Sequence, residues 1–199
     1  MAYPSVTAPY GLLPINLIGG QVFAGATRQI PIAASSATAI FYGDVVRLAD
    51  TGTLAKDTGT NAATPVGVFL GCTYTDPTFG KTFRQFYPGT TNISDIQAYV
   101  QDDPDALYKV AVVSSGTTVG TVTRTAVGEN AVLVQNAGST ANGNSRVAIS
   151  ATTATTSTWP VRVIDVVPAT SPAGFPGSFT EVIIKWNQGM HQYLNPTGV

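Results

Sequence analysis

The stretch Phe41–Tyr74, FYGDVVRLADTGTLAKDTGTNAATPVGVFLGCTY, decides the fold class of this chain. β-Branched and aromatic residues alternate in it with turn-forming residues, and no apolar spacing of 3.6 residues fits. We expect a strand over 44–48, a short polar return over 53–56, a loose loop, and a buried strand over 66–70. This pattern is typical of a small β-barrel or sandwich.

The composition of the whole chain favours the same fold class. Among its 199 residues, threonine occurs 28 times and valine 22 times, while lysine occurs four times and glutamate only twice. Residues that favour exposed helices are therefore scarce, and residues that pack on a pleated sheet are abundant. Charged residues make up 11% of the chain, against about 25% in soluble domains. We expect a surface that partners cover or that Thr and Ser hydroxyls coat.

Short strands separated by turn residues continue through a single body over 21–199. Beyond the opening stretch, the expected strands are 21–24, 29–33, 39–42, 82–86, 96–101, 107–113, 119–124, 131–135, 146–149, 161–167 and 180–186. The apolar spacing over 93–100 also fits a helix, and we favour the strand. The low-complexity segment ATTATTST, 151–158, is expected to be a flexible loop.

Residues 1–20 form an extended N-terminal arm in this interpretation. Pro4, Pro9 and Pro14 fix extended backbone at five-residue spacing, and Arg28 is the only charged residue before Asp44. An uncharged apolar arm is poorly solvated, so it must lie on something: its own domain, or a neighbouring subunit or other protein. A contact of the second kind would use Tyr3, Pro4, Val6, Tyr10, Leu12, Leu13, Ile15, Leu17 and Ile18.

Candidate catalytic chemistry is sparse, and we expect no enzyme and no cofactor. His191 is the only histidine, and no serine stands in a nucleophile motif that could use it. A single cysteine, Cys72, excludes an intrachain disulfide and a cysteine zinc site, and we interpret it as a small buried apolar residue. A net charge of −1 without a basic cluster argues against nucleic-acid binding. The proline-broken amino terminus predicts neither a secretory signal nor a membrane-spanning segment.

Two further clusters have alternative interpretations. The acidic run Asp102–Asp105 has the close carboxylates of a calcium loop but lacks the glycine and glutamate of an EF-hand, so we interpret it as a solvated turn. The aromatic residues of 79–87 interleave with Lys81 and Arg84, which could stack bases or sugars on a sheet face. Because only two cations accompany them, we favour packing in a core or a subunit interface.

Several passages spread over most of the chain carry a resemblance to a known kind of protein. They are PYGLLPINLIGGQVFAG (9–25), FYGDVV (41–46), PVGVFLGCTY (65–74), AYVQDDPDALYKV (98–110), the GNS turn (143–145) and KWNQGMHQYLNPTGV (185–199). Together they resemble a virion structural protein of marine tailed phages. The GDVV and PVGV strands are also similar to the small β-barrel of capsid decoration proteins, which sit as trimers on capsid three-fold positions.

The resemblance implies a phage head decoration (cement) protein that binds the outer capsid surface and bridges neighbouring major capsid protein subunits. Its implied partners are the major capsid protein and further copies of itself as a homotrimer, on the capsid exterior of the virion. The arm residues above would then form the capsid or subunit contact. Two alternatives remain open. One is a tail, neck or fibre-anchoring component, and the other is a carbohydrate-binding adhesion module that would use Trp159, Trp186 and the Tyr-rich ending.

Overall fold

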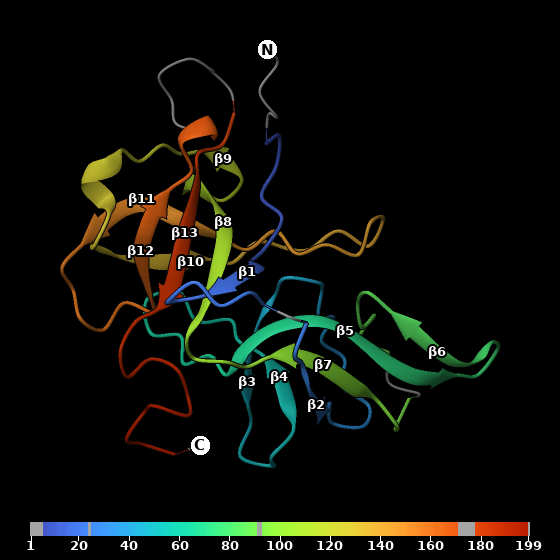
Figure 1. Cartoon of the computed structure of the whole chain (residues 1–199). Coiled ribbons are helices and arrows are strands. Elements are labelled where there is room, and N and C mark those ends of the chain that lie inside the picture. Colours follow the sequence, from blue (N-terminus) through green and yellow to red (C-terminus); the bar gives the residue numbers. More distant parts are fainter. Residues whose placement is uncertain (1–5, 24, 91–92, 171–177, 199) are drawn as a thin grey trace.

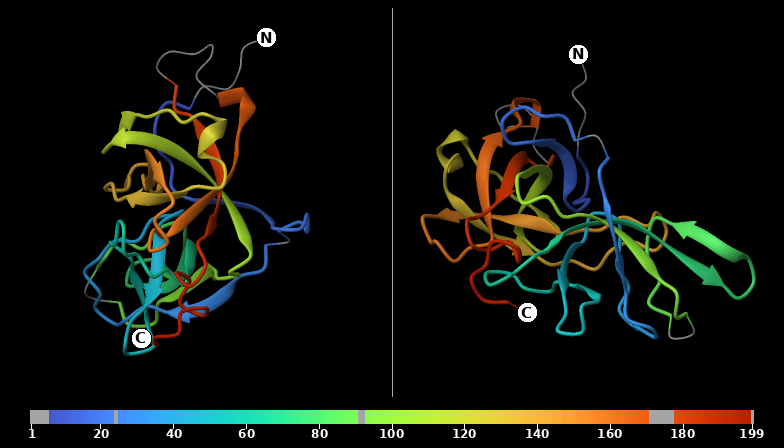
Figure 2. Two further views of the ribbon diagram at one scale, coloured as in Figure 1. Left: turned by 90° about the vertical axis from the view of Figure 1, so that its left-hand side faces the viewer. Right: turned by 60° about the horizontal axis from the view of Figure 1, so that its bottom comes forward.

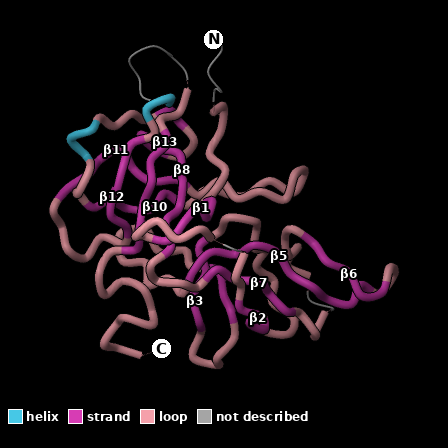
Figure 3. The backbone as a smooth tube through the Cα atoms, viewed as in Figure 1, coloured by secondary structure: helices cyan, strands magenta, loops and turns pink. Residues whose placement is uncertain are grey.

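The computed structural model describes residues 6–23, 25–90, 93–170 and 178–198, and these residues form an all-β structure (Figures 1 and 3). The strands are β1 Leu13–Leu17, β2 Arg28–Pro31, β3 Val45–Leu48, β4 Leu54–Lys56, β5 Gly67–Asp76, β6 Gly80–Arg84, β7 Gln97–Gln101, β8 Ala106–Ser115, β9 Thr118–Val119, β10 Asn130–Val134, β11 Ala148–Ala154, β12 Val161–Val166 and β13 Glu181–Trp186. Two single 3₁₀ turns, η1 (Arg124–Ala126) and η2 (Pro168–Thr170), are the helical elements of the described residues. The predicted all-β fold class is confirmed.

The first sheet closes into a small barrel. Its strand order is β1-β8-β11-β10-β12-β13, and an additional pairing between β13 and β8 completes a ring of five strands. Closure leaves these five strands without a long exposed edge. Along β8, Tyr108, Val110 and Val112 point into the main core, as the two-residue period of a strand requires.

The second sheet has the order β2-β7-β5-β3-β4, with β6 paired to β5. A single parallel bridge between Ile32 and Leu54 brings its two outer strands together. Its own core includes Phe69, Tyr87 and Cys72. Burial raises the pKa of the Cys72 thiol to about 12. At neutral pH the thiol is therefore protonated and packs as the small apolar group that the sequence predicts.

A buried charged network joins the two sheets, which lie one above the other in Figure 2. Asp44 is fully buried. Its carboxylate accepts hydrogen bonds from the Phe41 N–H (2.9 Å) and the Ser145 hydroxyl (2.6 Å), and it pairs with Lys56 Nζ (2.8 Å). The network therefore ties the start of β3 to β4 in one sheet and to the segment before β11 in the other. We call Asp44, Lys56 and Ser145 the junction.

The described part of the N-terminal arm packs on its own chain. β1 pairs antiparallel with β8, and Leu12 is fully buried in the main core. Val6 and Tyr10 pack against the second face of β8 beside Ala111 and Val113. The absence of charge in this segment follows from that role, because it covers a barrel strand that is buried on both faces.

Five local expectations are wrong. The polar return expected over 53–56 is strand β4, which pairs with β3, and the described part of the expected strand 21–24 makes only the bridge from Val22 to Asn16. The segment expected to be a loop, 151–158, continues β11 to Ala154, because its Ala and Thr side chains fit a pleated strand that pairs with β10. The expected strand 39–42 makes only isolated bridges, from Ile40 to Tyr87 and from Tyr42 to Asn144. The expected strand 119–124 is reduced to β9 and followed by η1.

Candidate functional site

The residues that the sequence marks as candidates for chemistry lie in separate segments of the described parts of the chain. No group of three or more His, Cys, Asp or Glu side chains there could hold a metal ion. Among the same residues, no helix is both long and apolar enough to cross a membrane.

His191 is a buried packing residue. Its ring is fully buried and packs against the Tyr193 ring, with 5.1 Å between ring centroids. Its Nδ1 accepts a hydrogen bond from the Tyr193 N–H at 3.3 Å. Burial lowers the pKa of the imidazole, which favours the neutral ring. The expectation that His191 is not catalytic stays a prediction.

The acidic run forms a turn with its carboxylates individually engaged. Asp103 Oδ1 accepts the Asp105 N–H at 2.8 Å, Asp105 pairs with Lys185 Nζ at 2.7 Å, and Asp102 pairs with Arg28 Nε at 3.0 Å. These contacts are the ones that a turn interpretation predicts, with side-chain oxygens satisfying turn amides. The turn also contributes one wall of a groove.

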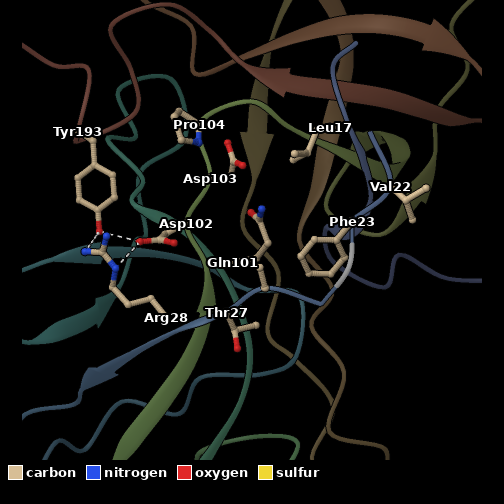
Figure 4. A pocket seen from close by; sticks show the side chains of 11 residues that line it. Leu17, Val22, Phe23, Thr27, Arg28, Gln101, Asp102, Asp103, Pro104 and Tyr193 are labelled. Atoms are coloured by element: carbon tan, nitrogen blue, oxygen red, sulfur yellow. Dashed lines mark hydrogen bonds and ion pairs between the residues drawn. The ribbon is translucent and has the colours of Figure 1, made fainter. Parts of the chain in front are cut away.

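The groove has a volume of about 690 Å³ and lies between the end of β1, at Leu17, and the acidic turn (Figure 4). We call it the arm groove; its lining includes Leu17, Val22, Phe23, Asp102, Asp103 and Tyr193. Val22 is 75% exposed, which is unusual for an aliphatic side chain beside other apolar groups. The volume falls in the range of about 300–1,000 Å³ that is common for binding clefts. The groove thus combines an accessible apolar floor with an acidic wall.

One edge of the arm groove is held by three polar side chains from distant parts of the chain (Figure 4). Arg28 pairs with Asp102, its Nη1 donates to the Tyr193 hydroxyl at 3.0 Å, and that hydroxyl donates to Asp102 Oδ2 at 2.9 Å. Burial and the Asp102 acceptor raise the pKa of Tyr193 to about 12. The charge of Asp102 is thereby paired, and the tail that carries Tyr193 is fixed against β2.

The second accessible surface is the β5–β6 hairpin, the part of the second sheet that projects beyond its other strands (Figures 1 and 2). Phe79 and Phe83 are 75% and 62% exposed. Phe83 shares one face of β6 with Lys81, and its ring meets the Tyr99 ring at 5.8 Å between centroids. The two rings meet over Gly71, which leaves room for them: a Cβ added at Gly71 would lie only 2.9 Å from Phe83 Cζ. We call the face formed by Phe79, Lys81, Phe83 and Tyr99 the hairpin face.

The aromatic run of 79–87 therefore divides into two groups. Tyr87 is fully buried, and Phe86 stacks on Phe41 at 5.4 Å, as the packing interpretation predicts. Phe79 and Phe83 do not pack in a core of their own chain. The sequence carries a signal for Phe79, since it lies in the turn Asp76–Gly80 at the tip of a hairpin. Nothing local in the sequence distinguishes Phe83 or Val22 from buried residues.

The predicted arm contacts lie in several environments. Tyr3 and Pro4 lie outside the described residues. Leu12 is buried, Ile18 is 45% exposed, and the half-buried remainder are Val6, Tyr10, Leu13, Ile15 and Leu17. Tyr10 donates a 2.5 Å hydrogen bond to Glu181, which also pairs with Lys109. Contact of these residues with a capsid or another subunit stays a prediction.

Comparisons of the chain with protein families, with curated proteins and with solved structures found no match. The arm groove and the hairpin face are two surfaces of the described chain that combine exposed apolar side chains with charge. Together they are the candidate functional site.

Proposed function

We propose that the protein is a phage head decoration (cement) protein. It binds the outer capsid surface and stabilises the lattice by bridging major capsid protein subunits. The resemblance of its passages to tailed-phage virion proteins supports the proposal, and so does the compact all-β structure. The mechanism is passive binding, in which several modest contacts add through multivalency.

The observation that carries the proposal is the open edge of β1. β1 stands at the end of the strand order. On its outer side the described residues supply the bridge from Asn16 to Val22 and, at the end of the strand, a hydrogen bond from the Leu17 N–H to Gln21 O at 2.8 Å. The strand has no charged residue, and Ile18 lies exposed directly after it. Such an edge can accept a strand of another protein, in which backbone hydrogen bonds give affinity and side chains give selectivity.

The junction suits a bridging role. A protein that links two lattice subunits transmits load between them, and a hinge between its two sheets would weaken that link. The hydrogen bond from Ser145 to buried Asp44, whose charge Lys56 pairs, fixes the sheets to each other instead. The body is therefore a rigid spacer that carries two accessible surfaces.

The alternatives receive less support. A carbohydrate-binding module needs an aromatic ring that is accessible to a sugar face. Trp186 is only 4% exposed and belongs to the barrel core, so such a module would have to use Tyr193 of the Tyr-rich ending, which is 41% exposed. A tail, neck or fibre-anchoring component would use the same kind of surface. It differs from a decoration protein in the number of copies that a particle holds.

The test is the copy number in purified virions of the phage that encodes the chain, measured by quantitative gel densitometry against the major capsid protein. The proposal predicts a copy number close to that of the major capsid protein. It also predicts that purified chain added to particles stripped of it restores the lost copies. Tens of copies per particle would overturn the proposal in favour of the tail or neck, and absence from the particle would overturn both.

A further inference from the structure

We propose that the hairpin face of one copy docks into the arm groove of a second copy, so that the protein assembles head to tail. This inference deepens the oligomer part of the proposed function by naming the two surfaces that meet. Purified chain without capsids tests it, so its failure and the failure of the capsid proposal are distinguishable.

The first argument is chemical complementarity. The hairpin face presents two exposed phenyl rings, Phe79 and Phe83. The arm groove offers an accessible apolar floor that includes Val22 and Phe23. Insertion would remove apolar surface from water on both sides, which is the main driving force for association. The projecting hairpin supplies the convex partner for a concave groove.

The second argument is charge. Within the hairpin, Arg84 pairs with Asp76 at 3.6 Å, and no ion pair engages Lys81 among the described residues. Within the groove, Arg28 pairs with Asp102, and no ion pair engages Asp103 in the same part of the chain. One surface therefore carries an ammonium near Asp95 that forms no ion pair among the described residues. The other carries a carboxylate whose Oδ1 accepts the Asp105 N–H and which likewise forms no ion pair there. The opposite charges select this pairing over like surfaces.

The third argument is geometry, which prevents a copy from filling its own groove. The groove lies at the Gln101 end of β7, which pairs with Val68 of β5. The hairpin tip begins at Asp76, and eight residues of strand from Val68 span about 26 Å. The two surfaces thus lie toward opposite ends of β5, and only another copy can bring them together. Contacts of this kind join unlike surfaces and close into a ring when the rotation permits, which for a decoration protein would be the trimer.

The experiment measures the mass of the purified full chain by sedimentation velocity over a concentration series. The proposal predicts concentration-dependent assembly of the wild type and, for Phe79→Ser/Phe83→Ser, an association weakened about tenfold or more. Lys81→Glu and Asp103→Lys should each weaken assembly, and the double variant should recover it. If the lysine disturbs that turn, Asp103→Asn, which keeps the side-chain acceptor of the turn, serves as the single groove variant and should also weaken assembly. Arg124→Glu makes the same kind of charge reversal on the barrel and should assemble as the wild type does.

Mixing separates head-to-tail contact from contact between like surfaces. A hairpin variant (Phe79→Ser/Phe83→Ser) and a groove variant (Asp103→Lys) retain one intact surface each, so together they should form a heterodimer and no ring. The proposal is wrong if the wild type stays monomeric at all concentrations or if the hairpin variant assembles like the wild type. It is also wrong if the double charge variant assembles no better than the single variants. Monomeric chain that binds capsids through Phe79 and Phe83 would assign the hairpin face to the capsid instead.

Discussion

The junction and the hairpin face depart from ordinary burial in opposite directions. At the junction a carboxylate, Asp44, is fully buried, while on the hairpin face two phenyl rings, Phe79 and Phe83, stand in solvent. The buried carboxylate accepts three hydrogen bonds or ion pairs from elements of both sheets. The exposed rings make no comparable set of contacts within their own chain.

The difference separates two kinds of unusual residue. A buried charge is retained where its partners fix one arrangement of elements, and removing it leaves those partners unsatisfied. An exposed aromatic side chain contributes little to its own fold, so its contribution is expected in a contact with another molecule. Stability should therefore depend on the junction and association on the hairpin face.

The largest effect should come from Asp44→Ala. The substitution strands the Lys56 ammonium, the Phe41 N–H and the Ser145 hydroxyl in a buried site. We expect a loss of about 3–5 kcal/mol in the free energy of unfolding, measured by urea denaturation. Asp105→Ala removes an exposed carboxylate from its pair with Lys185 and should cost less than about 1 kcal/mol. Equal losses in the two variants would refute a special role for the junction.

Gly11→Ala should also show how much stability depends on the junction, here through an added Cβ in a left-handed backbone conformation. Gly11 has φ +86°, and an added Cβ would lie 2.7 Å from Gly43 O and 2.7 Å from Ser145 Cβ, where the arm crosses the junction. Gly52 has a similar φ of +74° with no atom within 4 Å of the added Cβ. Gly11→Ala should therefore destabilise by about 1–3 kcal/mol more than Gly52→Ala, because only the first is also overpacked. Comparable thermal midpoints for the two variants would show that the arm does not press on the junction.

A smaller effect concerns the pH dependence of stability and the buried imidazole of His191. Burial lowers the pKa of its imidazole below the unfolded value, although Asp102 and Asp103 oppose the shift. The folded state then binds fewer protons than the unfolded state as the pH falls below about 6.5, so stability present above that pH is lost on acidification. His191→Phe should flatten the slope of unfolding free energy with pH below about pH 6.5. An unchanged slope would mean that another group titrates there.

The smallest effect should come from Phe79→Ala, whose side chain is 75% exposed. We expect a change within about 0.5 kcal/mol in the free energy of unfolding. Phe69→Ala, which truncates a fully buried ring in the second core, should cost about 3–5 kcal/mol. A loss at Phe79 as large as the loss at Phe69 would place the hairpin tip in the folded core and remove the contrast.

Much of the fold follows from the sequence. Alternating β-branched residues and turn formers predict most strands, including β3, β5, β8 and β13, because burial on a sheet imposes a two-residue period. The Thr-rich part of β11 escapes prediction because Thr and Ala carry little hydrophobic contrast along a strand. The closure of the barrel by β8 and β13 also escapes, since pairing between segments about 70 residues apart leaves no local pattern.

The candidate site is less accessible from sequence. The apolar arm is recognisable, yet its uncharged composition serves both the covering of β8 and an external contact, so composition alone cannot separate them. Exposure of Phe83 depends on its place in a hairpin that projects beyond β7, and exposure of Val22 depends on the path of the chain after β1. Both are consequences of topology and not of neighbouring residues.

The most direct test of the division between a stabilising junction and an associating hairpin is hydrogen–deuterium exchange of the wild-type chain. The exchange is measured at protein concentrations below and above the one at which sedimentation velocity shows that the chain associates. We predict that amides of β6 and amides around Val22 and Asp103 gain protection together on association, while protection in β8 and β13 stays unchanged. Protection that rises in the barrel strands, or at the hairpin without the groove, would contradict the account.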